Sequence, residues 1–179
     1  MLSTENNETE VLIEIPYGSN VKYELDDSGK IYVDRVLSTS MVYPGNYGFI
    51  ENTLAGDGDP IDVIIINHTP FAPCSRVKCR IIGVLETKDE KGSDEKIICV
   101  PVDKIDRRFA KYHDIVDISE TKLNMISHFF ENYKKLENNK YVEVLGYGDS
   151  ERAIKLVCKA IDRFKGIGDG FHVFNLVSQ

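Results

Sequence analysis

The chain has 179 residues, a length that suits one domain with a hydrophobic core, so we expect a single domain over residues 1–179. Hydrophobic residues make up 42% and charged residues 28% of the chain, which excludes a disordered composition. The net charge is −7, which disfavours nucleic acids and anionic membranes as partners because both bind basic surfaces.

The first two-thirds of the chain has the pattern of short strands separated by turns. The expected strands are Val11–Ile15, Val21–Leu25, Lys30–Arg35, Ile61–Ile66, Arg76–Glu86 and Lys96–Val102. The last two flank the polar segment 87–94, which predicts a hairpin.

The last third of the chain has helical periodicity. Apolar residues recur at three- and four-residue steps from Leu123 to Leu136, and Asp117 and Glu120 are spaced like a capping box. A second amphipathic run extends from Ala153 to Phe164, and we expect it to end at Gly166. Short strands followed by two helices predict an α+β domain built on a small β-barrel.

The acidic run Asp57-Gly58-Asp59-Pro60-Ile61-Asp62 is a candidate metal site. Two carboxylates about 4 Å apart repel by about 4 kcal/mol at an effective dielectric constant of about 20, so convergent carboxylates need a shared proton or a cation. Mg²⁺ prefers oxygen ligands of this kind. A solvated acidic turn explains the six residues equally well. An EF-hand calcium loop does not, because Asp62 stands where its glycine belongs and His68 where its glutamate belongs.

Other charged and aromatic residues are individually unremarkable. Asp89 and Asp94 flank the hairpin turn, and in an extended strand Asp94 and Lys96 would share one face. Taken singly, Lys22, Arg35 and Lys134 are explained as exposed cations. Tyr43 and Tyr47 are likewise explained as core aromatics.

Taken together, these segments resemble a known family. The series comprises Glu14-Ile15-Pro16, Lys22-Tyr23-Glu24, Asp34-Arg35, Tyr43-Pro44-Gly45-Asn46-Tyr47-Gly48, the aspartate run, Asp89 with Asp94 and Lys96, and His128-Phe129-Phe130-Glu131-Asn132-Tyr133-Lys134. In order and spacing it closely resembles the soluble family I inorganic pyrophosphatases of bacterial type, over about Glu10 to Lys165. The resemblance implies a closed five-stranded OB-like barrel with added strands and two C-terminal helices, and it leaves residues 166–179 as a C-terminal extension.

The same resemblance implies an inorganic diphosphatase that hydrolyses pyrophosphate to two orthophosphates by direct attack of a metal-activated water. It implies several Mg²⁺ ions per site, with Mn²⁺ able to replace Mg²⁺ and Ca²⁺ inhibitory, and assembly as a homohexamer. The implied metal ligands are Asp57, Asp62, Asp89 and Asp94, and the implied proton acceptor is Asp59. The implied phosphate-binding residues are Lys22, Arg35, Tyr47, Lys96, Tyr133 and Lys134, with Glu14, Glu24 and Tyr43 in support.

Two rival functions are less well supported by the sequence. A small β-barrel could be an OB-type nucleic-acid binder, but such proteins have a basic groove with stacking aromatics, and here acidic residues outnumber basic ones. A catalytically inactive homologue would be expected to have lost some of the matching positions. No apolar stretch approaches the roughly 20 residues that cross a bilayer. The polar, acidic start is unlike a signal peptide, so we expect a cytoplasmic protein with its four cysteines buried as free thiols.

Overall fold

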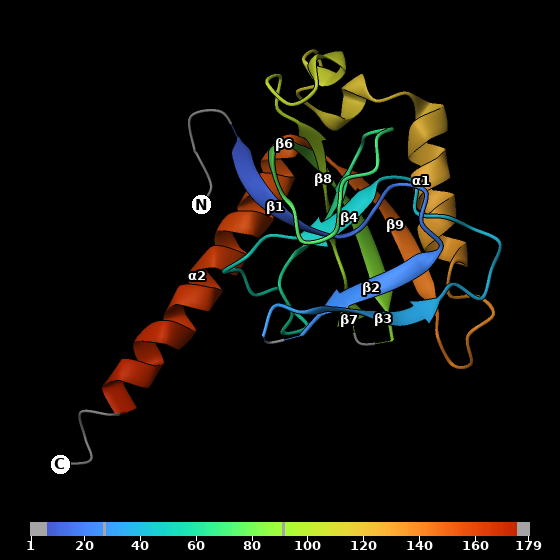
Figure 1. Ribbon diagram of the computed structural model, residues 1–179. Helices are drawn as coiled ribbons and strands as arrows, with labels where there is room; N and C mark the ends of the chain where they lie inside the picture. Colours follow the sequence, from blue (N-terminus) through green and yellow to red (C-terminus); the bar gives the residue numbers. More distant parts are fainter. Residues whose placement is uncertain (1–6, 27, 91, 175–179) are drawn as a thin grey trace.

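Five strands form a closed ring at the centre of the molecule. The computed structural model describes residues 7–26, 28–90 and 92–174, with side chains as far as Gly166. The ring comprises β1 (Glu8–Ile15), β4 (Asn46–Phe49), β5 (Asp62–Ile65), β8 (Lys96–Pro101) and β6 (Arg76–Asp89), and β6 pairs back with β1 (Figure 1). β5 and β8 run parallel, and the other pairs in the ring are antiparallel. The predicted α+β fold with an OB-like barrel is confirmed.

β5 and β8 are buried on both faces, which explains their nearly continuous apolar sequences. Side chains alternate between two hydrophobic clusters, because successive residues of a strand point to opposite faces. Ile64 and Ile98 pack in the cluster that contains Phe129 of the helix α1 (Glu120–Asn132). Val63 and Ile97 pack in the cluster that contains Val157 of the helix α2 (Ser150–Phe174). The two helices therefore cover different parts of the sheet.

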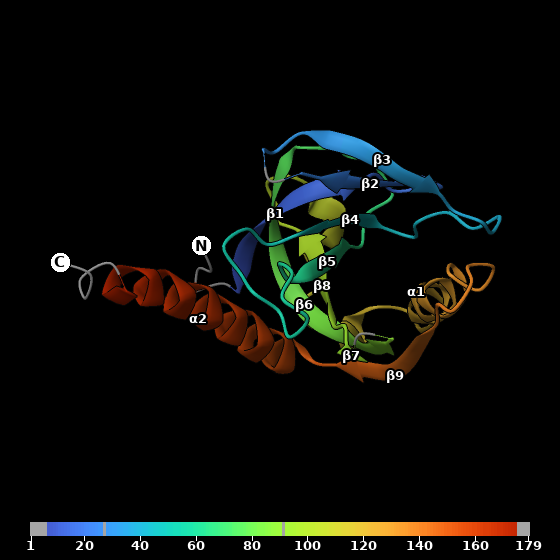
Figure 2. The same cartoon turned by 90° about the horizontal axis from the view of Figure 1, so that it is seen from below.

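Four further strands extend the barrel. β2 (Val21–Leu25) and β3 (Ile31–Val36) form a separate hairpin, which lies over β1 and β4 (Figure 2). Its pairing register shifts between Lys22 and Tyr23, so a bulge re-aims the side chains on either side. β7 (Gly92–Ser93) and β9 (Val142–Gly148) both pair with β6, and the predicted hairpin between β6 and β8 is confirmed.

The start of the first long helix differs from the prediction. α1 spans Glu120–Asn132, and its N-cap is Ser119, whose side chain accepts a hydrogen bond from the backbone N–H of Lys122. Asp117 instead belongs to the capping box of the short 3-10 helix η2 (Ile115–Asp117). A second 3-10 helix, η1, spans Arg107–Phe109. The predicted cap was wrong because a separate turn of helix ends immediately before α1 begins.

The second long helix, α2 (Ser150–Phe174), continues through Gly166, so the predicted end was also wrong. Gly166 is exposed and has no positive φ, so it does not adopt the left-handed conformation that ends helices. An internal glycine costs a helix only about 1 kcal/mol relative to alanine, which is too little to force an end. Figure 1 shows the C-terminal part of α2 extending beyond the barrel. Residues 175–179 of the expected extension lie outside the described part of the chain.

The four cysteines are free, but only two of them are buried as expected. Cys79 and Cys99 lie within the sheet, where burial raises the pKa of both thiols. Cys74 is exposed in a turn, and Cys158 on α2 is partly exposed. No helix in the described ranges is long and apolar enough to cross a membrane.

Candidate active site

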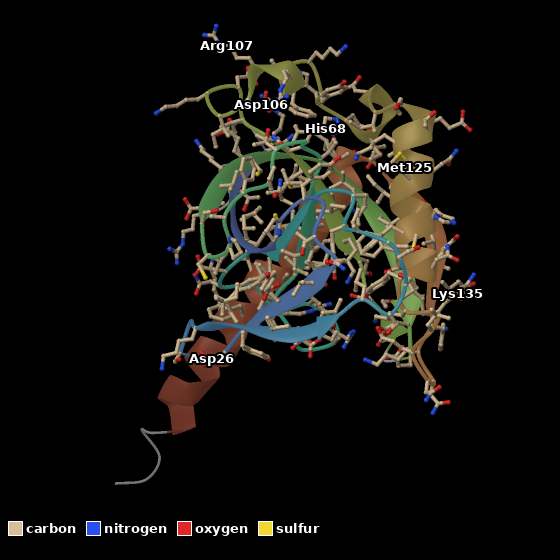
Figure 3. The ribbon with its side chains drawn as sticks, turned by 45° about the vertical axis from the view of Figure 1, so that its right-hand side comes forward. Asp26, His68, Asp106, Arg107, Met125 and Lys135 are labelled. Carbon is tan, nitrogen blue, oxygen red and sulfur yellow. The ribbon has the colours of Figure 1, made fainter. Side chains whose placement is uncertain are left out.

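A cleft of about 700 Å³ opens between the β2–β3 hairpin, the ring of strands and the segment that follows α1. Its walls are formed mainly by charged side chains. Asp26, on the turn of the hairpin, lies on this cleft, and Figure 3 shows it at the opposite end of the molecule from His68, Asp106 and Arg107. The last two residues belong to η1 or its cap, so the cleft and η1 lie at opposite ends of the barrel.

The structure brings nearly all of the predicted site residues to this cleft. Those that line it are Glu14, Lys22, Glu24, Arg35, Tyr47, Asp57, Asp59, Asp62, Asp89, Asp94, Lys96, Tyr133 and Lys134. Tyr43 does not line it. Its buried ring lies behind the wall, 5.5 Å from the ring of Tyr47 and 4.8 Å from that of Phe129. Tyr43 thus supports the ring of Tyr47 from the core.

Lys96 lies at the centre of the acidic wall, the part of the cleft that carries Glu14, Asp62 and Asp94. It is the first residue of β8 and pairs in parallel register with Asp62 of β5, and its side chain is only 5% exposed. Its Nζ lies 2.6 Å from Oδ2 of Asp62 and also forms an ion pair with Asp94. The predicted shared face of Asp94 and Lys96 is confirmed. Burial lowers the pKa of the Lys96 ammonium, but the two carboxylates outweigh it and raise the pKa overall.

The cleft is lined by more acidic than basic side chains. Burial, together with Asp62 and Glu24, raises the pKa of Glu14 to about 7. Burial also raises the pKa of Asp94, and the lowering effect of neighbouring Lys96 does not cancel it. Converging carboxylates in a partly buried site repel one another and favour an additional cation.

Asp57 and Asp59 lie on an exposed loop at the edge of the cleft. The backbone N–H of Asp59 donates to Oδ1 of Asp57 over 3.1 Å, which forms a local turn. The loop also contacts the last helix, because the N–H of Leu54 donates to the carbonyl oxygen of Ala160 in α2 over 3.0 Å. The aspartate loop is therefore attached to an element encoded far downstream.

Two acidic residues that the sequence did not identify as site residues pair with the basic side chains of the cleft: Asp34, which lines the cleft, and Glu137, which does not. Asp34 lies 3.5 Å from Nζ of Lys22 and 3.0 Å from Nη1 of Arg35. Glu137 lies 3.2 Å from Nε of Arg35, close enough for an ion pair but not aligned for a hydrogen bond. No sequence signal marked Glu137, which follows α1 in an irregular segment. Lys134 pairs with Asp89 over 3.4 Å.

The donor chemistry of the acidic wall fits a hard divalent cation, because carboxylate oxygens are its preferred ligands. The excess of acidic over basic side chains in the lining of the cleft supports the same fit. No three carboxylate, imidazole or thiol side chains form a ready-made metal cage within residues 7–26, 28–90 and 92–166. Lys96 holds Asp62 and Asp94 instead, so binding of a cation there would have to displace its ammonium group.

The cleft combines carboxylates, which can bind cations, with lysines and an arginine, which can bind anions. This is the donor set of a metal-dependent phosphoryl-transfer site. Comparison with known proteins agrees with this class. The family model of inorganic pyrophosphatase matches residues 11–165. The chain is 49% identical over 160 residues to the inorganic pyrophosphatase of Campylobacter jejuni, covering 89% of this chain and 93% of that protein. It is 51% identical over 160 residues to that of Rickettsia prowazekii, covering 88% and 93%.

A solved structure of the inorganic pyrophosphatase of Helicobacter pylori matches the fold with a TM-score of 0.89 at 48% identity, covering 92% of this chain and 98% of that one. The chain therefore belongs to the inorganic pyrophosphatase family. The predicted resemblance to the soluble family I enzymes of bacterial type is confirmed, as is the predicted enzyme class, an inorganic diphosphatase.

Proposed function

We propose that the protein hydrolyses inorganic pyrophosphate to two orthophosphates with Mg²⁺ as its cofactor, by direct attack of water. One observation carries the proposal: a single cleft unites the aspartates with Lys22, Arg35, Lys96 and Lys134. Pyrophosphate is a dense anion, so its hydrolysis requires positive charge around both phosphates and a proton acceptor for the attacking water.

Asp57, Asp62, Asp89 and Asp94 would hold the Mg²⁺ ions, with Glu14 and Glu24 nearby in support. When bound, Mg²⁺ lowers the pKa of water and neutralises charge on phosphoryl oxygens. Asp59 accepts the proton of the attacking water. Asp59 is exposed between Asp57 and Asp62 and lines the cleft, which supports this role. Among the described residues it forms no ion pair with a lysine or an arginine, unlike Asp62.

Six residues would bind the phosphates: Lys22, Arg35, Tyr47, Lys96, Tyr133 and Lys134. The guanidinium of Arg35 can bind two phosphate oxygens at once, whereas the lysines act as point charges. Tyr47 and Tyr133 are buried, and burial raises the pKa of both phenols, so at neutral pH they remain hydrogen-bond donors. No covalent step is needed, and no histidine with a described side chain lines the cleft.

We extend the proposal to assembly, metal preference and location. A homohexamer in the cytoplasm is supported by family membership, and Val116, Met125 and Leu136 supply exposed apolar surface around α1 for subunit contacts. Mn²⁺ would replace Mg²⁺ and Ca²⁺ would inhibit. Native mass measurement tests the assembly, and activity with each of the three metals tests the preference.

Phosphate release from pyrophosphate by the purified protein tests the main proposal. We expect release with Mg²⁺, and none after chelation with EDTA. The variant Glu151→Gln, which removes an acidic charge outside the cleft, should release phosphate like the wild type. Glu151 lies on the exposed surface of α2 and pairs only with Lys155 among the described ion pairs. Release that is unchanged by EDTA would refute the metal requirement, and no release with any of the three metals would refute the hydrolysis.

A further inference from the structure

Three threonines are almost completely buried in the described part of the chain: Thr9, Thr53 and Thr87, each at most 2% exposed. A buried hydroxyl is costly unless it forms hydrogen bonds, so its partners indicate its role. The hydroxyl of Thr9 has no hydrogen-bond partner. The hydroxyls of Thr53 and Thr87 both bind backbone groups of segments that carry the site aspartates.

Thr53 closes the neck of the aspartate loop. Its hydroxyl donates to the carbonyl oxygen of Ile50 over 2.6 Å and accepts from the N–H of Ile61 over 3.0 Å. The N–H of Ile50 also donates to the carbonyl oxygen of Ile61 over 3.1 Å, so the two ends of the loop are joined by the backbone and by this side chain. Asp57 lies inside the loop, and Asp62 follows Ile61 directly. The hydroxyl thus adds a second link, beside the backbone hydrogen bond, between the loop and the start of β5.

Thr87 performs the equivalent task across the hairpin. Its hydroxyl donates to the carbonyl oxygen of Asp94, and its own carbonyl oxygen accepts from the N–H of Asp94 over 2.9 Å. Both backbone polar groups of Asp94 therefore bind one buried residue of β6. The tip of the hairpin between these two residues includes β7. The carboxylate of Asp94 itself forms an ion pair with Lys96.

We propose that Thr53 and Thr87 are positioning residues that hold the carboxylates of Asp57, Asp62 and Asp94 at the separation that Mg²⁺ requires. The proposal rests on the function proposed above. Carboxylates on loops must be held to within about 0.5 Å for a functional site, and hydrogen bonds from outside the ligand set commonly provide this restraint. A hydroxyl is needed at both positions, because valine has the same shape but can neither donate nor accept.

Calorimetric titration with Mg²⁺, combined with thermal unfolding in EDTA, tests the proposal. We expect Thr53→Val and Thr87→Val each to weaken Mg²⁺ binding by about 10- to 100-fold, the range found for lost outer-sphere partners. Thr53→Ser and Thr87→Ser keep the hydroxyl and should bind Mg²⁺ like the wild type. Thr9→Val is the matched control: it removes a buried hydroxyl that holds no aspartate, so Mg²⁺ affinity should not change.

The outcomes separate the roles. A valine variant with a lower Tm in EDTA but wild-type Mg²⁺ affinity would make its threonine purely structural and overturn the proposal for that residue. Serine variants that bind Mg²⁺ 10-fold or more weakly than the wild type would overturn the role of the hydroxyl, and this comparison with the wild type remains available if a valine variant fails to fold. If the wild type itself binds no Mg²⁺, the proposed function fails first. Affinity lost with valine and restored with serine supports the proposal.

Discussion

Replacing Lys96 by methionine should separate the stability of the metal-free protein from that of the metal-bound protein. Methionine keeps much of the side-chain volume and removes the ammonium that lies 2.6 Å from Asp62 and also pairs with Asp94. Breaking a buried ion pair by removing one partner costs about 3–5 kcal/mol. The side chains of Asp62 and Asp94 are 30% and 16% exposed, so water and protonation offset part of the cost. We expect a loss of about 2–3 kcal/mol near pH 7 without metal.

The same substitution should strengthen the effect of Mg²⁺ on stability. Lys96 competes with any cation for Asp62 and Asp94, so its removal leaves both carboxylates available. Each tenfold gain in affinity adds about 1.4 kcal/mol of stabilisation when the metal is in excess. Turnover should nevertheless fall by about 10²-fold or more, because a donor aimed at charge that develops during reaction is lost.

Urea unfolding followed by circular dichroism, in EDTA and in excess Mg²⁺, measures both effects. Lys155→Met is the control, because Lys155 pairs with Glu151 on the exposed surface of α2 and such pairs contribute at most about 1 kcal/mol. An equal loss of stability in EDTA and in Mg²⁺ would refute the competition between Lys96 and metal. A metal-free protein as stable as the wild type would refute the structural role of the ammonium.

Three further results follow from the site and the core. Asp59→Asn should fold and bind Mg²⁺ but lose about 10²-fold or more in kcat, and wild-type rates across the pH range would show that Asp59 is not the proton acceptor. Glu14 has a pKa of about 7 in the folded protein, against an ordinary value of 4.5. The folded state therefore binds a proton more tightly than the unfolded state does. The stability of the metal-free protein should be full below about pH 4.5 and fall by at most about 3 kcal/mol by pH 7. Glu14→Gln should reduce this slope in urea unfolding at different pH values, and Asp94, whose pKa burial also raises, keeps a share of it. An unchanged slope would assign the effect to groups other than Glu14. Ile126→Ala, at a fully buried position of α1, should cost about 2–5 kcal/mol of stability, whereas a loss below about 1 kcal/mol would mean that the core around α1 repacks.

Much of the site could be predicted because its residues are concentrated in short segments with distinctive chemistry. The aspartate run alone was compatible with two hypotheses, a metal site and a solvated acidic turn. The structure has features of both. Asp57 and Asp59 do form an exposed turn, yet that turn faces the same cleft as Asp62 and Lys96. Strand alternation also correctly placed Asp94 and Lys96 on one face.

The parts that could not be predicted depend on long-range contacts or on small energies. The bulge beside Lys22 shifts the register of the hairpin, and Glu137 reaches Arg35 only because the chain turns back after α1. Neither effect leaves a periodic signal in the sequence. Gly166 resembled a helix end, but whether a single glycine ends a helix depends on a difference of about 1 kcal/mol. Asp117 and Glu120 are spaced like a capping box, but Asp117 belongs to the 3-10 helix η2, and Ser119 caps α1.

The hydrogen bond between Leu54 and Ala160 has a consequence for the order in which the protein matures during synthesis. It joins a loop in the first third of the chain to a helix near its C-terminal end. A growing polypeptide that has not yet emerged as far as Ala160 lacks this acceptor, so the contact between the aspartate loop and α2 forms only when nearly the whole chain has been made.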